Sequence, residues 1–222
     1  MSSDLDGPRL APASGGQARQ LVVLVHGFGA DGNDLIGLGR EWATLLPDAA
    51  FVSPHGPEPC AGAPSGYQWF ALNRIDPNEV AVGSRNAAPL LEDFIARELE
   101  RLALPDTALA LVGFSQGTMM ALQVGLRRAR PPAAIVGYSG ALAAPEALAN
   151  EIMAQPPVLL VHGDADQVVP LEALFLATAG LASVEVPVEW HIRNGVGHGI
   201  DGPSIAMGGA FLSDGFAAAG VR

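Results

Sequence analysis

A serine between two glycines is the first feature of this 222-residue chain that suggests covalent chemistry. Residues 113–117 read G-x-S-x-G, with Ser115 at the centre. An apolar, strand-like run precedes this pattern and a helix-forming run follows it. A nucleophilic serine on a tight turn requires this strand–turn–helix order. The glycines at 113 and 117 are then needed because side chains there would collide with the neighbouring strand and helix. The alternative is a serine that merely caps a helix.

A serine hydroxyl needs a general base, and five histidines compete for that role. In hydrolases with this turn the chain order is serine, acid, histidine, which excludes His26 and His55. His162 precedes the candidate acids, and His191 stands inside a strand-like run. His198 lies in a glycine-rich loop, NGVGHGI, just after the last expected strand. We therefore predict that His198 is the base.

The acid that orients this base should follow the strand that ends near residue 161. The segment HGDADQVVP offers Asp164 and Asp166, and their spacing alone does not separate them. One is expected to orient His198 and the other to bond to loop backbone. Asp164 stands early in the turn, where a short carboxylate commonly accepts from backbone N–H groups two residues on. Asp166 stands further out, where the chain can reach back toward the edge of the sheet.

These side chains must be positioned by a framework of alternating strands and helices. Most of the strand-like runs are continuously apolar, a pattern typical of parallel strands covered on both faces. They are Leu21–Val25, Ala50–Ser53, Ala108–Val112, Ala134–Tyr138, Val158–Val161 and Val186–Ile192. Helices are expected from a cap at Asn33 or Asp34 to about Leu46, and over 86–103, 116–128, 170–181 and about 203–218. The alternation predicts an α/β fold with a doubly wound, mostly parallel sheet. Loops beyond the carboxyl ends of its strands should carry the active groups.

Residues 1–20 are rich in serine, glycine, proline and alanine and are predicted to be a flexible tail. Their composition does not resemble a signal peptide. No linker or internal repeat interrupts the rest, so residues 21–222 are expected to form a single domain.

The loop after the first expected strand, HGFGADGNDL, supports two different functions. Gly27-x-Gly29-x-x-Gly32 matches a dinucleotide-binding fingerprint, which would indicate an oxidoreductase. That fingerprint also needs an acid at the end of the next strand, where this chain has only Ser53-Pro54-His55-Gly56. In the other interpretation the loop supplies half of an oxyanion hole. The two donors would be the backbone N–H groups of Phe28 and Gln116.

Composition limits the partners and the compartment. The formal net charge of −11 argues against nucleic acid and anionic membrane surfaces, because both repel an acidic protein. No apolar run approaches the roughly 20 residues of a membrane helix, so stable membrane insertion is not expected. The single cysteine, Cys60, excludes an intramolecular disulfide and is compatible with the cytoplasm.

Several motifs in order along the chain resemble one family. They are LVHGFGADGNDL, QWF, GFSQGTMMAL, GYSGAL, HGDADQVVP and GVGHGI. Together they are similar to the acyl-protein thioesterases and small bacterial carboxylesterases, which are α/β-hydrolases with little or no lid. The resemblance implies Ser115 as nucleophile, Asp166 as acid and His198 as base, with Phe28 and Gln116 as oxyanion donors. It also implies that no cofactor is needed, and no metal site is visible in the sequence.

Trp69, Phe70, Met119 and Val169 are expected to line a substrate pocket together with Phe28, since their loops should converge at one edge of the sheet. For Met119 and Val169 the alternative is a place in the core. We predict a serine carboxylesterase that hydrolyses short- to medium-chain esters, with a small-molecule ester or thioester as partner. Acyl-protein thioesterase and lysophospholipase activity are alternatives on the same site. The oligomeric state, including a homodimer, stays open.

Overall fold

Seven strands form one mostly parallel sheet in the computed structural model, which describes residues 4–60, 63, 65–72 and 76–221. The order across this sheet is β1-β3-β2-β6-β7-β8-β9, and only the β1–β3 pair in it is antiparallel. Two further short strands, β4 and β5, pair separately. The strands are β1 (Arg9–Leu10), β2 (Gln20–Val25), β3 (Ala49–Val52), β4 (Glu58–Pro59), β5 (Tyr67–Gln68), β6 (Leu109–Phe114), β7 (Ala134–Tyr138), β8 (Val158–Gly163) and β9 (Val188–Arg193).

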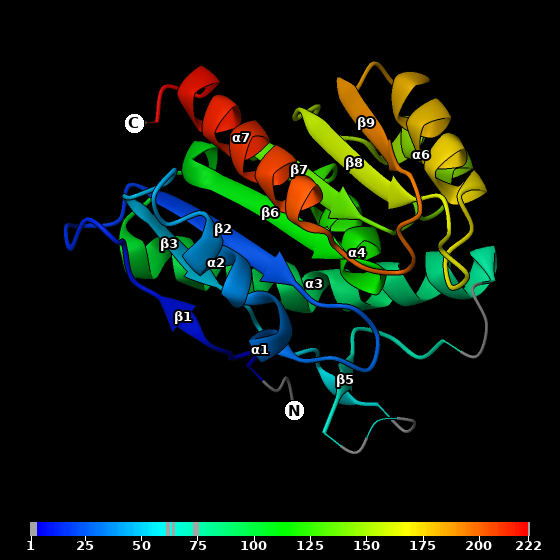
Figure 1. The fold of residues 1–222 in the computed structure, drawn as a ribbon, viewed down its shortest axis with the longest axis horizontal. Coiled ribbons are helices and arrows are strands. Elements are labelled where there is room, and N and C mark those ends of the chain that lie inside the picture. Colours follow the sequence, from blue (N-terminus) through cyan, green and yellow to red (C-terminus); the bar gives the residue numbers. More distant parts are fainter. Residues whose placement is uncertain (1–3, 61–62, 64, 73–75, 222) are drawn as a thin grey trace.

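Helices cover both faces of the sheet, as Figure 1 shows. The α-helices are α1 (Gly32–Leu35), α2 (Gly37–Glu41), α3 (Pro77–Leu102), α4 (Gln116–Gly125), α5 (Leu148–Glu151), α6 (Glu172–Ala182) and α7 (Gly202–Ala218), with short 3-10 turns η1 (Asp106–Ala108) and η2 (Pro145–Ala147). Apolar residues of α3, α4 and α6 build the core on one face. Those of α1, α2 and α7 build the core on the other face. The predicted doubly wound α/β architecture is confirmed.

All six predicted strands are present in the sheet, with ends that differ by up to two residues. Every residue of β2, β3, β7 and β8 is buried, because helices cover these strands on both sides. β9 differs: it has no buried residue and lies at the edge of the sheet. Parallel pairing brings the carboxyl ends of β6, β7, β8 and β9 to a common edge.

The expected helix from residue 33 to about 46 is wrong in detail. The chain forms two short helices instead, and the second ends at Glu41. Asp31, rather than Asn33 or Asp34, caps the first helix by accepting from the N–H of Asn33 at 2.7 Å. The helix expected over 86–103 begins earlier, at Pro77, where Asp76 accepts from the N–H groups of Asn78 and Glu79.

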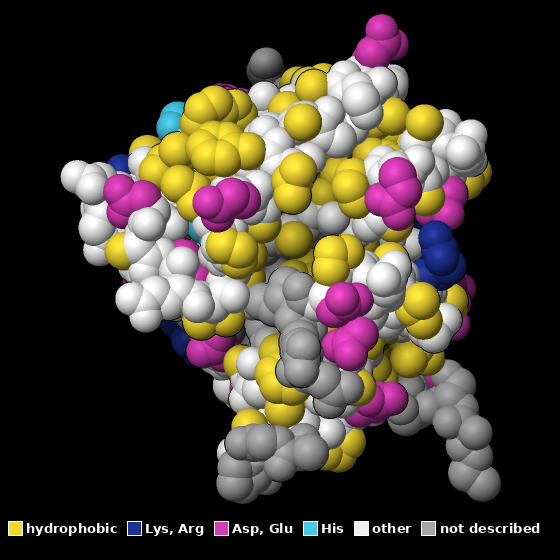
Figure 2. Space-filling model, turned by 90° about the vertical axis from the view of Figure 1, so that its right-hand side faces the viewer, with side chains coloured by type: hydrophobic (Ala, Val, Ile, Leu, Met, Phe, Trp, Pro, Cys, Tyr) yellow, Lys and Arg dark blue, Asp and Glu magenta, His cyan; other side chains and the backbone are white. Residues whose placement is uncertain are grey.

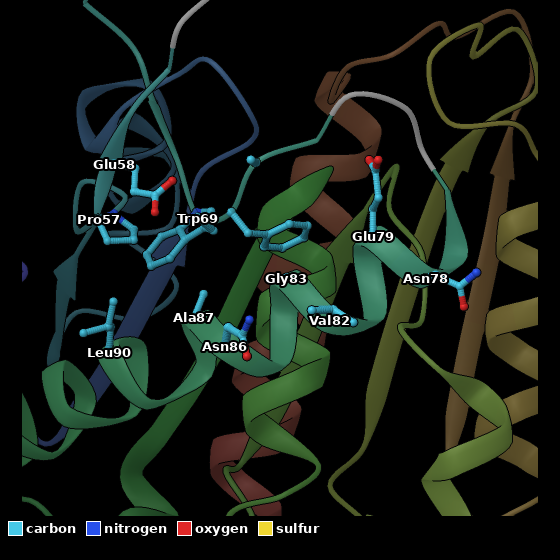
Figure 3. A pocket seen from close by; sticks show the side chains of 12 residues that line it. Pro57, Glu58, Trp69, Asn78, Glu79, Val82, Gly83, Asn86, Ala87 and Leu90 are labelled. Atoms are coloured by element: carbon cyan, nitrogen blue, oxygen red, sulfur yellow. The ribbon is translucent and has the colours of Figure 1, made fainter.

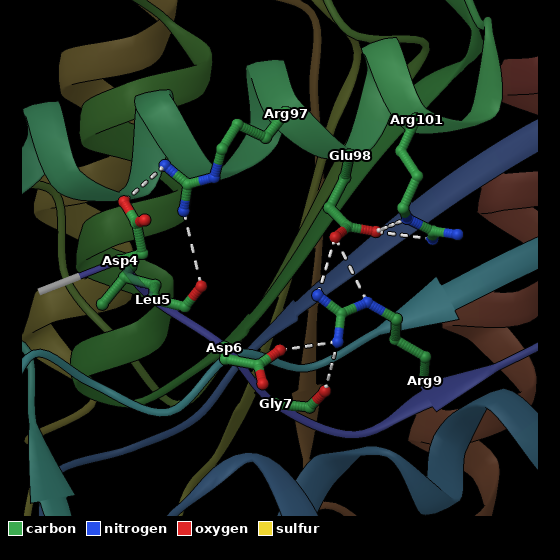
Figure 4. Close-up of polar contacts among 8 residues, drawn as sticks. All are labelled: Asp4, Leu5, Asp6, Gly7, Arg9, Arg97, Glu98 and Arg101. Atoms are coloured by element: carbon green, nitrogen blue, oxygen red, sulfur yellow. Dashed lines mark hydrogen bonds and ion pairs between the residues drawn. The ribbon is translucent and has the colours of Figure 1, made fainter.

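The described part of the N-terminal segment is built into the fold, which corrects the expectation of a flexible tail over residues 1–20. β1 extends the sheet beside β3, and Leu5 is buried. Figure 4 shows the polar contacts that hold this segment against α3. The Arg9 guanidinium lies 2.8 Å from Oε1 of Glu98 and 2.6 Å from Oδ1 of Asp6. Burial raises the pKa of Glu98, but hydrogen bonds from Arg9 and Arg101 outweigh it, so the net pKa is lowered.

Candidate active site

Ser115 stands on a sharp turn between β6 and α4. Its backbone adopts φ +53° and ψ −116°, a conformation that a non-glycine residue rarely takes. Such a residue stores on the order of 1–3 kcal/mol of strain and persists only where its surroundings hold it. The N–H of Ser115 donates to the carbonyl of Tyr138 in β7 at 2.9 Å, and its carbonyl accepts from the N–H of Thr118 at 3.0 Å. Both neighbouring elements therefore fix this turn.

The two flanking glycines allow the turn to fit. A Cβ atom on Gly113 would lie 2.3 Å from the carbonyl oxygen of Gly117 in α4. A Cβ atom on Gly117 would lie 1.8 Å from the carbonyl oxygen of Val25 in β2. Real Cβ atoms do not approach backbone this closely, and backbone cannot move aside cheaply. The predicted collision with the neighbouring helix and strand is confirmed.

Asp166 and His198 form a hydrogen-bonded pair at the same edge of the sheet. Nδ1 of His198 donates to Oδ2 of Asp166 at 2.8 Å. The other carboxylate oxygen accepts from the N–H groups of Val168 and Val169, both at 2.9 Å. Burial raises the pKa of Asp166, but these three hydrogen bonds outweigh it, so the pKa lies below its ordinary value. Asp166 is therefore a fixed carboxylate that holds one orientation of the imidazole.

The imidazole of His198 lies beside the serine turn. Its ring centroid is 4.8 Å from that of Phe114, the residue before Ser115. Because Nδ1 is used by Asp166, Nε2 is the nitrogen left for a reacting group. Among the described residues neither Nε2 of His198 nor the hydroxyl of Ser115 has a hydrogen-bond partner. Catalytic hydrogen bonds are often long before substrate is present.

Asp164 has a different role from Asp166. Its Oδ1 accepts from the N–H of Gly195 at 2.6 Å, and its own N–H donates to the carbonyl of Arg193 at 3.1 Å. The bond to backbone was expected, but its partner lies in the loop after β9 rather than two residues on. Asp164 therefore ties the acid-bearing loop to the loop that carries His198.

Two of the other histidines hold loops around the site. His26 is fully buried, and its Nδ1 donates to the carbonyl of Gly27 at 2.7 Å. Its Nε2 accepts from the N–H of Gly56 at 2.8 Å, and burial lowers its pKa, so the ring is neutral. Nε2 of His162 donates to the carbonyl of Val169 at 2.9 Å and lies 3.4 Å from Oδ2 of Asp166. Sequence reasoning gave neither residue this loop-holding role.

The glycine loop after β2 passes directly beside Ser115. A Cβ atom on Gly27 would lie 3.4 Å from the Cβ of Ser115, so the next residue, Phe28, is close to the turn. The N–H of Gln116 is the first of α4 and has no acceptor within its own helix. No described residue accepts from the N–H of Phe28 or of Gln116. The two predicted donors are thus near the nucleophile and unoccupied.

The side chain of Gln116 makes contacts that the sequence did not reveal. Its Oε1 accepts from the N–H of Trp69 at 2.9 Å, and its Nε2 donates to the carbonyl of Phe70 at 2.8 Å. The indole N–H of Trp69 in turn donates to the carbonyl of His26 at 2.9 Å. Gln116 and Trp69 therefore lock the 69–70 segment onto both the serine turn and the glycine loop.

The predicted pocket residues separate into two groups. Trp69 and Phe70 line a cavity of about 600 Å³ that is closed on its other side by α3, with Gly83 and Leu90 among its residues (Figure 3). Met119 is 1% exposed and belongs to the core, and Val169 is fully buried. Neither of these two lines a described cavity.

Two more cavities are lined by loops at the carboxyl ends of the strands. An apolar one of about 350 Å³ lies between the loop after β7, the loop after β8 and the starts of α3 and α6. It is lined by Pro77, Asn78, Val80, Ala141, Leu142, Ala143, Ala144, Pro145, Glu146, Pro170, Glu172, Ala173 and Leu176. We call it the α3–α6 cavity. The other, of about 440 Å³, includes Phe114, His198 and residues of α1 and α2.

Across the described residues we find no group of three or more His, Cys, Asp or Glu side chains arranged to hold a metal ion. The Gly27-x-Gly29-x-x-Gly32 pattern leads into a helix of only four residues. A Cβ atom on Gly32 would lie 2.0 Å from the carbonyl oxygen of Ser53, so this glycine is explained by packing. Of the helices that the structure describes, none has both the length and the apolar character to span a membrane.

Comparison with known proteins agrees with this geometry. A sequence model of the phospholipase/carboxylesterase family matches residues 11–214. The chain is 29% identical to the esterase YpfH of Escherichia coli (strain K12) over 188 residues, which are 85% of this chain and 79% of that protein. It is 27% identical to acyl-protein thioesterase 1 of Gibberella zeae over 215 residues, 89% of this chain and 91% of that protein. The crystal structure of esterase PE8 matches with a TM-score of 0.91 and 43% identity, over 96% of this chain and 99% of that one. These similarities favour a hydrolase over a dinucleotide-dependent oxidoreductase.

Proposed function

The chain belongs to the phospholipase/carboxylesterase family of α/β-hydrolases, and from this premise we propose that it hydrolyses short- to medium-chain carboxylic esters through an acyl-enzyme on Ser115. One observation carries the proposal. A hydrogen-bonded Asp166–His198 pair lies beside a serine held at positive φ. This is the arrangement that a serine nucleophile needs from its base and its acid.

In the acylation step, Nε2 of His198 takes the proton of the Ser115 hydroxyl while its oxygen attacks the acyl carbonyl carbon. The bond from that carbon to the alcohol oxygen then breaks, and His198 gives its proton to the departing alcohol. In the second step water attacks the acyl-serine ester, again with His198 as base, and the carboxylic acid leaves. Asp166 stays ionised throughout, since its lowered pKa keeps the carboxylate available to the imidazolium.

The negative charge on the carbonyl oxygen is stabilised by the N–H groups of Phe28 and Gln116. The N–H of Gln116 also has the positive end of the α4 dipole behind it. Removing one such donor in a related type of site typically lowers kcat by about 10²–10³. The contacts of the Gln116 side chain and Trp69 support this role, because they hold both donors in place before substrate arrives.

The α3–α6 cavity is our choice for the acyl chain. Gly140 directly precedes Ala141, a lining residue, and a Cβ atom on Gly140 would lie 2.9 Å from the carbonyl oxygen of Ser115. On its other side Pro170 follows Val169, whose N–H binds Asp166. The cavity therefore begins within a few residues of both nucleophile and acid. Its volume of about 350 Å³ is at the small end for ligand sites, which favours short and medium chains.

Thioester hydrolysis is the second candidate. Relatives named acyl-protein thioesterase cover most of the chain, and the same steps apply with a thiolate as leaving group. Lysophospholipid cleavage would use the same site. We propose a small-molecule ester or thioester as partner and the cytoplasm as location, which the buried, unpaired thiol of Cys60 supports.

The test is a hydrolysis screen with p-nitrophenyl esters and acyl thioesters of graded chain length. We expect turnover to be highest below long chains, and a fluorophosphonate probe to label Ser115. Ser115→Ala should lose both turnover and labelling and keep its melting temperature.

Ser139→Ala is the matched control, because Ser139 is a buried serine in the next loop and its hydroxyl has no partner among the described atoms. It should keep labelling and turnover. Labelling that survives in Ser115→Ala, or an optimum at long-chain triglycerides, would count against the proposal.

A further inference from the structure

The two edges of the main sheet differ in how they meet solvent. β1 has only two residues, whereas β9 has six and no described strand lies beyond it. The carbonyls of Pro187 and Arg193 accept from β8, so the odd-numbered residues of β9 turn their backbone toward β8. The N–H and C=O groups of Val188, Trp190 and Ile192 therefore point outward. Such an edge can pair with another strand unless proline, a bulge or charged side chains, above all lysine, block it. β9 contains no proline and no lysine, and its two charged residues, Glu189 and Arg193, have opposite signs.

One face of β9 adds an apolar surface to this open edge. Trp190 is 46% exposed and Ile192 38%, and both lie on the side of the sheet that α6 covers. Phe175 of α6 contacts Trp190 edge-on, with ring centroids 6.1 Å apart, and is itself 46% exposed. Figure 2 views the molecule from this side and shows hydrophobic side chains gathered in its upper part. We call Trp190, Ile192 and Phe175 the β9–α6 patch.

The opposite face of β9 carries charges in an order that matches itself. Glu189 and Arg193 stand two residues on either side of His191. Within one copy Glu189 bonds to His191 at 2.7 Å and Arg193 to Asp201 at 3.0 Å, so a contact between copies would add to these pairs. In an antiparallel pairing centred on His191, Glu189 of one copy faces Arg193 of the other. The same register places Trp190 opposite Ile192. Opposite charges and large apolar side chains that face each other across strands stabilise pairing by about 0.2–1 kcal/mol each.

We propose that two copies of this chain associate through antiparallel pairing of their β9 strands, about a two-fold axis at His191, to form a continuous sheet across a homodimer. A second copy is the partner that fits, because the charges complement the same strand reversed, as in an isologous interface. The two-fold axis would also bring both β9–α6 patches onto one face. The backbone register agrees with this pairing. The outward N–H and C=O groups of Trp190 and Ile192 would exchange hydrogen bonds between copies, and His191 would face its copy in a non-bonded pair.

This dimer leaves the catalytic edges apart. The carboxyl ends of antiparallel β9 strands point in opposite directions, so the two His198 loops lie at opposite ends of the interface. A monomeric variant should therefore keep its ester hydrolysis. Association of two copies can therefore be measured by molar mass, whatever the enzyme hydrolyses.

The first measurement is the molar mass by sedimentation equilibrium over a range of protein concentrations. We expect about twice the 22.8 kDa of the chain. Trp190→Glu should raise the dimer dissociation constant by at least about 30-fold, the effect of losing an interface residue worth 2 kcal/mol. At protein concentrations below the dimer dissociation constant, the melting temperature of Trp190→Glu should match that of the wild-type monomer. A wild-type chain that stays monomeric at every concentration would overturn the proposal.

The second measurement tests the register by disulfide cross-linking in a Cys60→Ala background. Non-bonded antiparallel pairs have Cα atoms about 4.5 Å apart, which a disulfide can span. His191→Cys should therefore cross-link to its copy on mild oxidation. Glu189→Cys is the matched control, since it lies on the same face but would face Arg193 rather than itself. Cross-linking of Glu189→Cys alone, or of both variants equally, would contradict this interface.

Discussion

Replacing Asp166 by asparagine is the sharpest test of how this site orients its base. Oδ1 of Asp166 accepts from two backbone N–H groups, so an asparagine would keep its carbonyl oxygen there. Its amide NH₂ would then face Nδ1 of His198, where a donor now meets an acceptor. Two donors cannot share this contact. The imidazole would adopt the other tautomer, with its proton on Nε2, and could no longer take the proton of Ser115.

A wrong tautomer in a site of this kind lowers kcat by about 10³–10⁴, which corresponds to roughly 4–5.5 kcal/mol in the activation free energy. The melting temperature should change little, because both backbone hydrogen bonds are kept. The assay is kcat for a p-nitrophenyl ester, with thermal melting on the same samples.

Asp164→Asn is the matched control, because its remaining oxygen can still accept from the N–H of Gly195. It should keep most of its turnover and lose no more than about 1 kcal/mol of stability. If Asp164→Asn loses turnover while Asp166→Asn keeps it, the assignment of the acid is reversed and the tautomer argument fails.

Three further predictions concern the framework. Gly117→Ala should lower the free energy of unfolding by about 3 kcal/mol or more, because its Cβ would meet the Val25 carbonyl. Gly37→Ala is the control and should lower it far less, because a Cβ there has no atom within 4 Å. Equal urea midpoints for the two variants would contradict this prediction. Arg9→Met should lower stability by about 1 kcal/mol at unchanged m-value, since Arg101 still neutralises Glu98, and an unaltered urea midpoint would mean that the N-terminal segment contributes nothing. Hydrogen bonds from Arg193 and Ser204 lower the pKa of Asp201 from 3.8 to about 2. Its carboxylate therefore stabilises the fold above about pH 4 and loses this effect as the pH falls toward 2. The melting temperatures of wild type and Asp201→Asn should therefore differ at pH 6 and converge near pH 2. An undiminished difference in melting temperature at pH 2 would refute the stabilising role of this carboxylate.

The part of the site that depends on chain order could be predicted from the sequence. In a parallel sheet, groups that follow successive strands meet at one edge, so the loops of Ser115, Asp166 and His198 had to converge. The collision that requires glycine at 117 was predictable for the same reason, because strand, turn and helix pack against a neighbouring strand. The pairing of Asp166 with His198 is present at 2.8 Å.

What the sequence could not show depends on contacts between distant segments. β1 is only two residues long, and the Arg9–Glu98 ion pair joins positions 89 residues apart. No local sequence pattern predicts this strand or this ion pair. Asp76-Pro77, with Glu79 at the third helical position, did mark the start of α3. The expected start at residue 86 missed this capping signal, because the prediction followed only the apolar face of the helix.

Pocket residues were the hardest to predict. Met119 belongs to α4, in which all ten residues are buried, and an apolar residue in such a helix reads the same whether it faces a core or a ligand. Only the packing distinguishes them. The hydrogen bonds from the Gln116 side chain to residues 69 and 70 could not be predicted for a similar reason. The sequence does not show which backbone groups an amide side chain will bind.

The double contact of Gln116 with the 69–70 backbone has a consequence for anyone who redesigns this scaffold. A loop graft between β5 and α3, aimed at new substrates, would exchange a segment whose backbone is held by the first residue of α4. If the new loop does not suit the residue at position 116, both hydrogen bonds to the loop backbone are lost. The serine turn then also loses these contacts. Mutant libraries should therefore vary this loop and position 116 together.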